Sequence, residues 1–403
     1  MKTIILTSRP IQSRHSGYDL RVANLCAHLP GEVHLVVAPL VAAADPRLSI
    51  AADEIFDSIE ELPPLLAGRL SVRRHLRLSD DHFLQRAMPA AFAAARDRLR
   101  AVVRERDVTH VVVFGGELAE LAATLDHPGV VLDVCDSRSL TARRALEWSA
   151  HPPTGLHRWR RRLALHRMRA SEARFPERFG HVTTISEPDS REILELHGPA
   201  TNVHSIPNGV AESFLAPLPS PGARRGVAFW GNLGFAPNAE ALWFFVRQVY
   251  LPVLRDADVE LCVVGADAPG WLTELAASEP RIALTGFVED LRAAVTPYPI
   301  MINPMCTGSG MKNKVLEAFG LGLAVVSTPL GVEAVPAARD GIHFVGAADP
   351  AALGSAVLDL LADEPHRRTI RGQANALLHE LYPWDVVGRN WQSLFGCDQT
   401  AIG

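Results

Sequence analysis

Cysteine is sparse in this sequence, and long apolar runs are missing. The 403 residues contain five scattered cysteines, with no Cys-x-x-Cys pair and no metal-ligand spacing. This distribution excludes a disulfide framework and a zinc-ribbon site, and it predicts reduced thiols in a cytoplasmic protein. No apolar run is long enough to span a bilayer, and the run after Met1 is too short for a signal peptide. The cysteines are Cys26, Cys135, Cys262, Cys306 and Cys397.

An excess of positive charge is also missing. The net charge is −5 at pH 7, so the electrostatic footprint of a nucleic-acid-binding protein is absent and no nucleic-acid partner is expected. The hydrophobic content of 48% and charged content of 21% are ordinary for a globular protein, and the length favours two domains. No acidic metal motif occurs in the sequence, and no cofactor is expected.

The most informative segment is 308–319, which reads Gly-Ser-Gly-Met-Lys-Asn-Lys-Val-Leu-Glu-Ala-Phe. It follows a short apolar run at 299–304 that is typical of a buried strand. The two glycines allow a tight turn and a close approach of the backbone to a ligand. A helix is expected to begin near Met311 or Lys312.

The start of that helix predicts a diphosphate site. Its first amides have no partner within the helix and lie at the positive end of the dipole, next to Lys312 and Lys314. One turn later, Glu317 is placed to accept hydrogen bonds from a ribose diol, as acids do in dinucleotide folds. The alternative is an ordinary strand-to-helix turn with solvated lysines and a glutamate that complements the dipole.

The first half of the chain predicts a parallel α/β unit. Apolar runs at 3–7 and 33–38 flank a polar loop and a helix, and such a loop lies at the ligand-binding end of a sheet. Its candidate residues are Arg14, Ser16 and Gly17, with Gly17 nearest a bound sugar or phosphate. Arg14 and Arg21 are placed to reach an anion, although both also fit as surface charges.

Acids lie at the end of a later strand candidate of the first half. The apolar run at 130–134 contains Asp133 and is followed by Asp136, so either acid is a candidate for orienting an acceptor hydroxyl. In the alternative interpretation, Asp136 or Ser137 caps the next helix.

The segment 157–174 is strongly basic and reads as an amphipathic helix. A basic amphipathic helix can lie on an anionic membrane surface, which here would be the inner face of the membrane. The alternative is a solvated face paired with acids elsewhere.

Proline and glycine between 215 and 226 mark a boundary, after which the strand and helix pattern restarts. We expect an N-terminal domain over 1–210, a linker over 211–224, a second domain over 225–380 and a tail helix over 381–403. The tail carries two tryptophans that need an apolar surface, so it is expected to cross back onto the first domain. The predicted fold class is therefore two Rossmann-like α/β domains.

The segment 308–319 resembles the C-terminal half of the retaining family-4 glycosyltransferases, which have two facing Rossmann-like domains in the GT-B arrangement. The segments 231–238, 286–291 and 324–333 are similar to family segments in the same order. The resemblance is greatest to sugar transferases of bacterial polysaccharide and exopolysaccharide clusters, which carry a Gly-x-x-Asn-Lys-Val-Leu-Glu-Ala segment.

The resemblance implies a nucleotide-sugar donor held mainly by the second domain, without a metal. By this analogy Glu317 binds the ribose hydroxyls, amides near Val315 and Leu316 contact the phosphates, and the backbone at Val288 contacts the base. The full set of donor-binding candidates is Asn232, Val288, Gly308, Ser309, Gly310, Met311, Lys312, Lys314, Val315, Leu316 and Glu317.

Three departures from the family pattern matter. Ser309 stands where many relatives carry a first glutamate, and Asn232 lies in a loop where many carry an arginine and a lysine. A histidine expected near 114–117 is also missing. We hypothesise that the lysines of 308–319 supply the missing charge to the leaving diphosphate. The catalytic candidates are accordingly Lys314 and Asp136.

The expected function is a metal-independent retaining glycosyltransferase. It would transfer a sugar from a nucleotide-diphosphate donor to a glycan, glycolipid or small-molecule acceptor in polysaccharide biosynthesis. One alternative is a nucleotide-sugar 2-epimerase of the same fold, which would convert the donor without an acceptor. Another is a non-catalytic nucleotide- or glycan-binding partner of a transferase, which would bind nucleotide without turnover.

Overall fold

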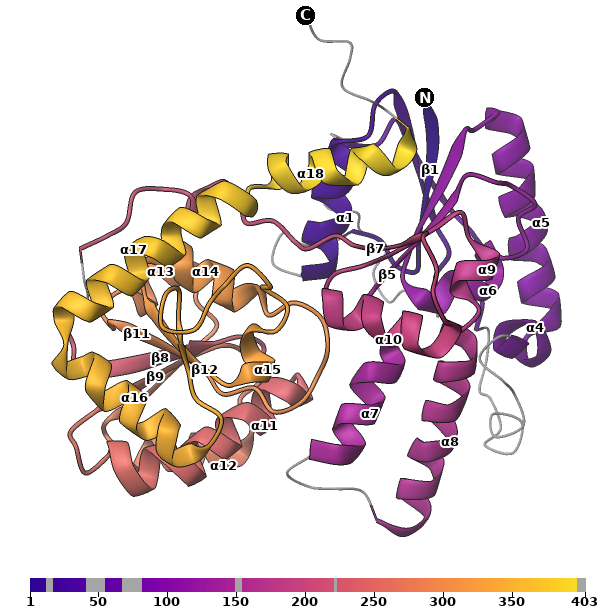
Figure 1. Ribbon diagram of the computed structural model, residues 1–403. Coiled ribbons are helices and arrows are strands. Elements are labelled where there is room, and N and C mark those ends of the chain that lie inside the picture. Colours follow the sequence, from indigo (N-terminus) through magenta and orange to yellow (C-terminus); the bar gives the residue numbers. More distant parts are fainter. Residues whose placement is uncertain (12–16, 41–54, 67–81, 149–153, 221–222, 397–403) are drawn as a thin grey trace, which may run out of the picture. The chain divides into compact units, whose positions relative to one another are not determined.

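The computed structural model describes residues 1–11, 17–40, 55–66, 82–148, 154–220 and 223–396 (Figure 1). The chain divides into two compact α/β units. The first contains Met1–Arg143, Thr154–Asn208 and Trp384–Gly403, and the second contains Arg144–Pro153 and Gly209–Pro383.

The first unit is built on a parallel seven-stranded sheet with the strand order β3-β2-β1-β4-β5-β6-β7. The order reverses between β1 and β4, as in doubly wound sheets. Its elements are β1 (Lys2–Thr7), α1 (Gly17–Ala27), β2 (Glu32–Val37), β3 (Ser58–Glu61), α4 (Phe83–Ala87), α5 (Pro89–Arg106), β4 (His110–Phe114), the 3₁₀ turn η2 (Gly116–Leu118), α6 (Ala119–Ala122), β5 (Val130–Cys135), the start of α7 (Arg138–Trp148), α8 (Gly155–Glu172), α9 (Phe175–Arg178), β6 (His181–Thr184), α10 (Glu187–His197) and β7 (Val203–Ser205). The residues of α7 from Arg144 onward belong to the second unit.

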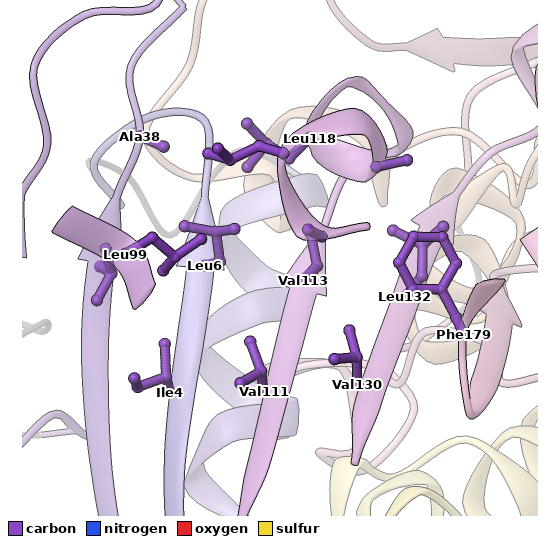
Figure 2. Close-up of a cluster of buried hydrophobic side chains, with 14 of the residues drawn as sticks. Ile4, Leu6, Ala38, Leu99, Val111, Val113, Leu118, Val130, Leu132 and Phe179 are labelled. Carbon is purple, nitrogen blue, oxygen red and sulfur yellow. The ribbon is translucent and has the colours of Figure 1, made fainter. Parts of the chain in front are cut away.

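The central strands of this sheet are apolar on both faces because helices cover both sides. Alternate residues such as Ile4, Val111 and Leu132 point into one core with α5 (Figure 2). The residues between them, such as Ile5 and Val112, point into a second core with α1. The two-residue period of a strand therefore divides one apolar run between two cores.

The tail helix α18 (Trp384–Gln392) and the 3₁₀ turn η5 (Ser393–Phe395) pack within the first unit. Trp391 is fully buried, and its ring lies 6.2 Å from that of Phe114. Gly388 lies so close to the His28 ring of α1 that a Cβ there would clash. The apolar side of α18 therefore completes the core on the α1 face of the sheet.

The second unit has a parallel six-stranded sheet with the order β10-β9-β8-β11-β12-β13, which reverses between β8 and β11. The predicted fold class of two parallel α/β domains is thus confirmed. The elements of the second unit are the 3₁₀ turn η3 (Glu212–Phe214), β8 (Gly226–Trp230), α11 (Ala236–Phe245), the π-helix η4 (Val246–Leu254), β9 (Glu260–Val264), α12 (Gly270–Ser278), β10 (Ile282–Gly286), α13 (Leu291–Val295), β11 (Ile300–Asn303), α14 (Asn313–Leu321), β12 (Ala324–Ser327), α15 (Pro329–Val332), β13 (Val345–Gly346), α16 (Pro350–Ala362) and α17 (Glu364–Leu381).

The segment 211–224, which was expected to be a linker, contacts the second unit in its described part. Phe214 packs against the core of the second unit. Arg292 donates to the Ser213 carbonyl at 2.5 Å, and Arg371 donates to the Pro219 carbonyl at 2.6 Å. Apolar contact and guanidinium hydrogen bonds therefore attach this proline-rich stretch to the second unit.

The basic segment forms most of α8, as its pattern predicted. Leu156 is 59% exposed and Trp159 is 52% exposed, and the neighbouring arginines are exposed as well. Among the described helices, none combines the length and the apolar character needed to cross a bilayer.

Candidate functional site

The candidate site of the second unit lies where its strand order reverses. The loops that follow the neighbouring strands β8 and β11 leave the sheet at its carboxyl edge, on either side of the reversal. Open α/β sheets bind ligands at such a point because the two loops turn away from each other and leave a crevice. The glycine-rich segment 308–310 follows β11, and Gly231 follows β8 directly.

The backbone after β11 uses both glycines as predicted. Gly308 has φ +93° and Gly310 has φ +68°, and residues other than glycine rarely adopt these backbone angles. Helix α14 begins at Asn313, close to the predicted start, and its N-cap residue Lys312 makes no side-chain cap hydrogen bond. The positive end of the helix therefore follows directly from the glycine turn.

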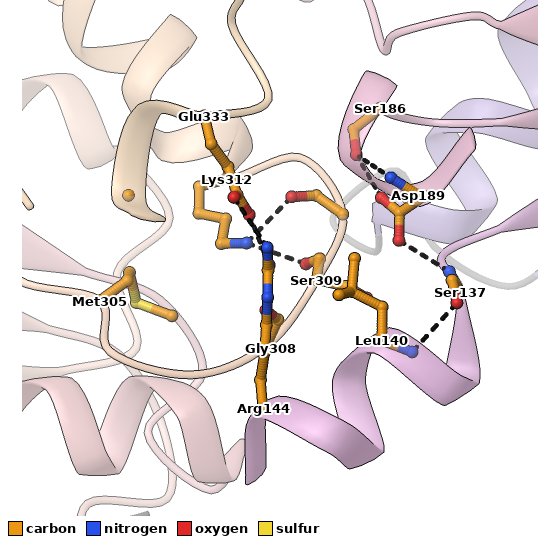
Figure 3. Close-up of polar contacts among 12 residues, drawn as sticks. Ser137, Leu140, Arg144, Ser186, Asp189, Met305, Gly308, Ser309, Lys312 and Glu333 are labelled. Carbon is orange, nitrogen blue, oxygen red and sulfur yellow. Dashed lines mark hydrogen bonds and ion pairs between the residues drawn. The ribbon is translucent and has the colours of Figure 1, made fainter. Parts of the chain in front are cut away.

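Lys312 is directed back into its own loop. Its ammonium group donates to the carbonyl oxygens of Ser309 and Gly310, both at 2.9 Å (Figure 3), and the side chain is buried. These contacts brace the turn, and a contribution of the Lys312 charge to diphosphate binding stays a prediction.

Lys314 is the buried cation of the site. Its ammonium group donates to Asn238 Oδ1 at 2.7 Å and lies 4.2 Å from the centre of the Phe229 ring. A Cβ on Gly231 would lie only 3.3 Å from the Lys314 Nζ, so the backbone after β8 passes very near this charge. Burial lowers the pKa of Lys314 to about 7; the negative charge of Glu317 opposes this fall, and the positive charge of Lys312 adds to it to a smaller extent.

Glu317 lies one turn further along α14. Its Oε2 accepts a 2.6 Å hydrogen bond from the indole Nε1 of Trp230, the last residue of β8. Burial raises the pKa of Glu317, while Trp230 and Lys314 act in the opposite direction. The sequence identified Glu317, but it contained no signal for its indole partner, which lies 87 residues away.

The other donor-binding candidates differ in their exposure and contacts. Asn232 is exposed, and its Oδ1 accepts from the Gly234 amide at 2.8 Å, which shapes the loop after β8. The side chains of Val315 and Leu316 are fully buried, so only their backbone can meet a ligand. Met311 and Val288 are half-buried against the apolar core of α14.

An ion pair lies beside the glycine turn. Arg144 donates to both carboxylate oxygens of Glu333, at 2.5 and 2.8 Å, and to the Gly308 carbonyl at 2.9 Å (Figure 3). A bidentate pair of this kind has a defined geometry. It therefore fixes one end of the turn, while Lys312 braces the other.

The candidate residues of the first unit are only partly described by the structure. Arg14 and Ser16 lie outside the described residues, and Gly17 is the exposed first residue of α1. Arg21 is neither a surface charge nor an anion ligand, because it is buried and paired with Asp133 at 2.6 Å. Both expectations for Arg21 were wrong, since the sequence did not reveal a buried carboxylate 112 residues away.

Asp133 is correspondingly excluded as an acceptor-orienting acid. Besides Arg21, its carboxylate accepts hydrogen bonds from Thr183 Oγ1 at 2.8 Å and from the Cys135 amide at 3.0 Å. Asp136 is exposed at the end of β5. The capping role falls to Ser137, whose Oγ accepts from the Leu140 amide at 3.1 Å (Figure 3).

Sequence reasoning missed a polar cluster at the strand-order reversal of the first unit. Ser8, after β1, donates to Glu117 Oε1 at 2.6 Å, and Glu117 follows β4. Arg9 pairs with the buried Asp19 at 3.2 Å and lies over the Tyr18 ring. The available signal was the position of Glu117 after two glycines at the end of an apolar run.

No group of three or more histidine, cysteine or carboxylate side chains is arranged to hold a metal ion within the described ranges.

Comparisons with known proteins agree with this architecture. Residues 224–363 match the family model described as Glycosyl transferases group 1, which corresponds to most of the second unit. Anabaena HepE in complex with UDP superposes with a TM-score of 0.64 at 13% identity, covering 98% of this chain and 100% of HepE. Sucrose-phosphate synthase from Thermosynechococcus elongatus gives a TM-score of 0.68 at 13% identity, covering 99% and 100% of the two chains.

Two further similarities are informative. WaaG, a glycosyltransferase involved in lipopolysaccharide biosynthesis, superposes with a TM-score of 0.62 at 13% identity over 98% of this chain and 100% of WaaG. An uncharacterised 44.6 kDa protein of the cps region of Klebsiella pneumoniae is 30% identical over 115 residues. That match covers 27% of this chain and 30% of the Klebsiella protein.

Residues 224–363 of the second unit thus match a group 1 glycosyltransferase model, and the two parallel α/β units have the GT-B fold. The class of protein that this domain and this fold support is a glycosyltransferase enzyme.

Proposed function

We propose that this protein is a metal-independent, retaining glycosyltransferase. It transfers a sugar from a nucleoside-diphosphate donor to a glycan, glycolipid or small-molecule acceptor, in polysaccharide biosynthesis. The observation that carries the proposal is the pair Lys314 and Glu317 on the first turns of α14, next to the strand-order reversal of a group 1 glycosyltransferase domain.

The proposed roles follow from chemistry. Negative charge develops on the diphosphate as it leaves, and a buried ammonium group stabilises that charge more strongly than an exposed one. Lys314 is therefore the proposed catalytic cation, assisted by the amides around Val315 and Leu316. Glu317 accepts from the ribose hydroxyls, and the backbone at Val288 contacts the base. Lys312 holds the turn of Gly308, Ser309, Gly310 and Met311 in shape.

Two kinds of relatives support the substrate classes. HepE was crystallised with UDP and with UDP-glucose, which supports a nucleotide-sugar donor. WaaG acts in lipopolysaccharide biosynthesis, and the Klebsiella relative is named for a cps region, which supports a glycan or glycolipid acceptor.

Ligand-dependent stability tests the donor site directly. The protein is heated with the diphosphates of uridine, guanosine, thymidine and adenosine in turn, because a ligand that binds the folded state raises its stability by mass action. We expect one of these nucleoside diphosphates to raise the Tm of the wild type and to have a much smaller effect on the Tm of Glu317→Gln. Equal, negligible shifts with all four nucleotides would contradict the proposal.

Turnover tests the chemistry. With the matching nucleotide sugar and a panel of glycan and lipid acceptors, we expect transfer that persists in EDTA and that preserves the donor's anomeric configuration in the NMR spectrum of the product. Loss of transfer in EDTA would overturn metal independence, and an inverted anomer would overturn retention. Conversion of the donor without an acceptor would indicate an epimerase.

Peripheral membrane contact is a finer part of the proposal. Helix α8 exposes Leu156 and Trp159 beside the exposed Arg160, Arg161 and Arg162, and basic amphipathic surfaces bind anionic lipids. We expect co-sedimentation with phosphatidylglycerol vesicles but not with phosphatidylcholine vesicles, and weaker binding in Trp159→Ser. Arg191→Ser on α10, where the arginine pairs with Glu187, is the control. Equal sedimentation with both vesicle types would contradict the proposed membrane contact.

A further inference from the structure

The acid and the base of α14 do not pair with each other. Lys314 and Glu317 are three positions apart, a spacing at which oppositely charged side chains on a helix usually meet. The structure records no ion pair between these two described residues. Each one is instead held by a neutral side chain from a different element, and this arrangement requires a physical explanation.

The neutral partner of Glu317 is an indole. Trp230 is only 4% exposed at the end of β8, and its Nε1 lies 2.6 Å from Glu317 Oε2. An indole N–H is a donor only and carries no charge. It therefore fixes the carboxylate without neutralising it, and it leaves Oε1 with its lone pairs for other donors.

The neutral partner of Lys314 is an amide. Asn238, on α11, accepts from the Lys314 ammonium group at 2.7 Å, and its Nδ2 donates to the Asn232 carbonyl at 2.8 Å. Both ends of the amide are engaged, so its orientation is determined. The ammonium group has two more N–H donors and no carboxylate partner among the described residues.

Gly231 makes this arrangement possible. Its φ is +144°, and a Cβ there would lie 2.9 Å from Asn238 Nδ2 and 3.3 Å from Lys314 Nζ. A side chain would therefore force either the amide or the ammonium group to move.

We propose that Trp230 and Asn238 are positioning residues that hold Glu317 and Lys314 apart, so that the carboxylate stays open to ribose hydroxyls and the ammonium group to the diphosphate. This inference rests on the proposed donor site. It adds that the site depends on preventing an internal ion pair that would occupy both ligand groups.

The proposal predicts a specific coupling between Trp230 and Glu317. Without the indole, Glu317 turns toward Lys314, and the resulting ion pair competes with the ligand for the ammonium group. Trp230→Phe should therefore weaken binding of UDP and also of inorganic pyrophosphate, which has no ribose. The losses should be roughly tenfold, the usual size of a hydrogen bond to a charged group.

A double variant separates this mechanism from simple damage to the fold. In Trp230→Phe combined with Glu317→Gln, no carboxylate remains to pair with Lys314. Pyrophosphate affinity should return to at least the wild-type level, while UDP binding stays weak because the ribose contact is lost. Removing Glu317 alone should change pyrophosphate binding much less than it does in the Trp230→Phe background.

Asn238→Asp tests the proposed role of Asn238 in keeping Lys314 free of a carboxylate partner. It places a carboxylate directly on Lys314 and should weaken pyrophosphate binding by about tenfold or more, since a buried charge pair is strong. Asn390→Asp makes the same charge change at an exposed position of α18 and should have no effect.

Titration calorimetry with UDP and with pyrophosphate provides the measurements, and Trp391→Phe is the matched tryptophan control. Trp391 is fully buried, and its Nε1 has no hydrogen-bond partner in the described structure. Additive effects of the Trp230 and Glu317 changes, with no rescue of pyrophosphate binding, would overturn the inference. If the wild type binds none of the four nucleoside diphosphates, the proposed donor site itself fails.

Discussion

The two units share the same strand order over six strands, but the buried charges that follow their first strands differ in the partners that hold them. In the first unit, Arg21 pairs with Asp133 and Arg9 pairs with Asp19. In the second unit, Lys314 and Glu317 are held by the neutral groups of Asn238 and Trp230. The same topology therefore supports ion pairs around Arg21 and Arg9 in the first unit. In the second unit it supports a cation and a carboxylate whose hydrogen-bond partners are neutral.

This difference shows how a binding site can be distinguished from a buried network on one type of sheet. A buried charge is costly unless it is paired, so a fold that leaves one with only neutral partners sacrifices stability there. The pKa of Lys314, lowered to about 7, is the sign of that cost. The second unit is accordingly where we expect the donor to bind, and the predictions below test this contrast.

The largest effect is expected from breaking the buried pair of the first unit. Arg21→Met leaves the Asp133 carboxylate buried without its cation, which should lower the free energy of unfolding by about 3–5 kcal/mol. Urea unfolding followed by circular dichroism measures the change. The control is Arg255→Met, because Arg255 is an exposed residue with only a surface partner. A loss below about 1 kcal/mol, the range of a surface pair, would mean that Arg21 is not structurally important.

A large loss of activity is expected in the second unit. Lys314→Met removes the proposed catalytic cation, and kcat/KM for sugar transfer should fall by roughly 10²–10³, as when a preorganised electrostatic group is lost. Stability should not fall, because a desolvated charge is replaced by an apolar chain of similar length. Lys2→Met, at an exposed lysine, is the matched control. An unchanged kcat/KM would contradict the catalytic role.

The charge state of Lys314 predicts an intermediate effect that depends on pH. Burial lowers its folded pKa to about 7, below its unfolded value, so the unfolded state binds more protons between the two pKa values. The destabilisation by Lys314 is therefore full below about pH 7 and is relieved as pH rises toward the unfolded pKa of about 10.4.

The measurement compares the wild type with Lys314→Met. The gap in Tm between them should narrow from pH 7 to pH 9, and pyrophosphate should bind the wild type more weakly at the higher pH because the ammonium group is lost. Pyrophosphate binding by Lys314→Met should change little over the same range. If Tm changed with pH in the same way in both proteins, Lys314 would not titrate between pH 7 and pH 9.

The smallest effect is expected at the strand-order reversal of the first unit. Ser8→Ala removes the hydroxyl that donates to Glu117 and should cost about 1 kcal/mol of unfolding free energy. Because the proposed donor site lies in the second unit, UDP affinity should be unchanged. A tenfold loss of UDP affinity would remove the functional contrast between the units.

Much of the local structure was predictable. The apolar runs indicated strands, and the Gly-Ser-Gly turn before α14 was recognisable because φ values near +93° and +68° favour glycine. The resemblance to a glycosyltransferase family predicted the fold, and the site role of Glu317 stays a prediction. Arg21 was misjudged, because its structural role depends on a partner that no local pattern reveals.

The sequence by itself determined the strands, the glycine turn and the helix with its lysine and glutamate, since these depend on periodicity and on backbone preferences within a few residues. Tertiary structure alone decided which charges are neutralised. Asp133 is 112 residues from Arg21, Trp230 is 87 from Glu317, and Asn238 is 76 from Lys314. A pKa or an open lone pair depends on which groups the fold brings within 3 Å, and that distance is unrelated to separation along the chain.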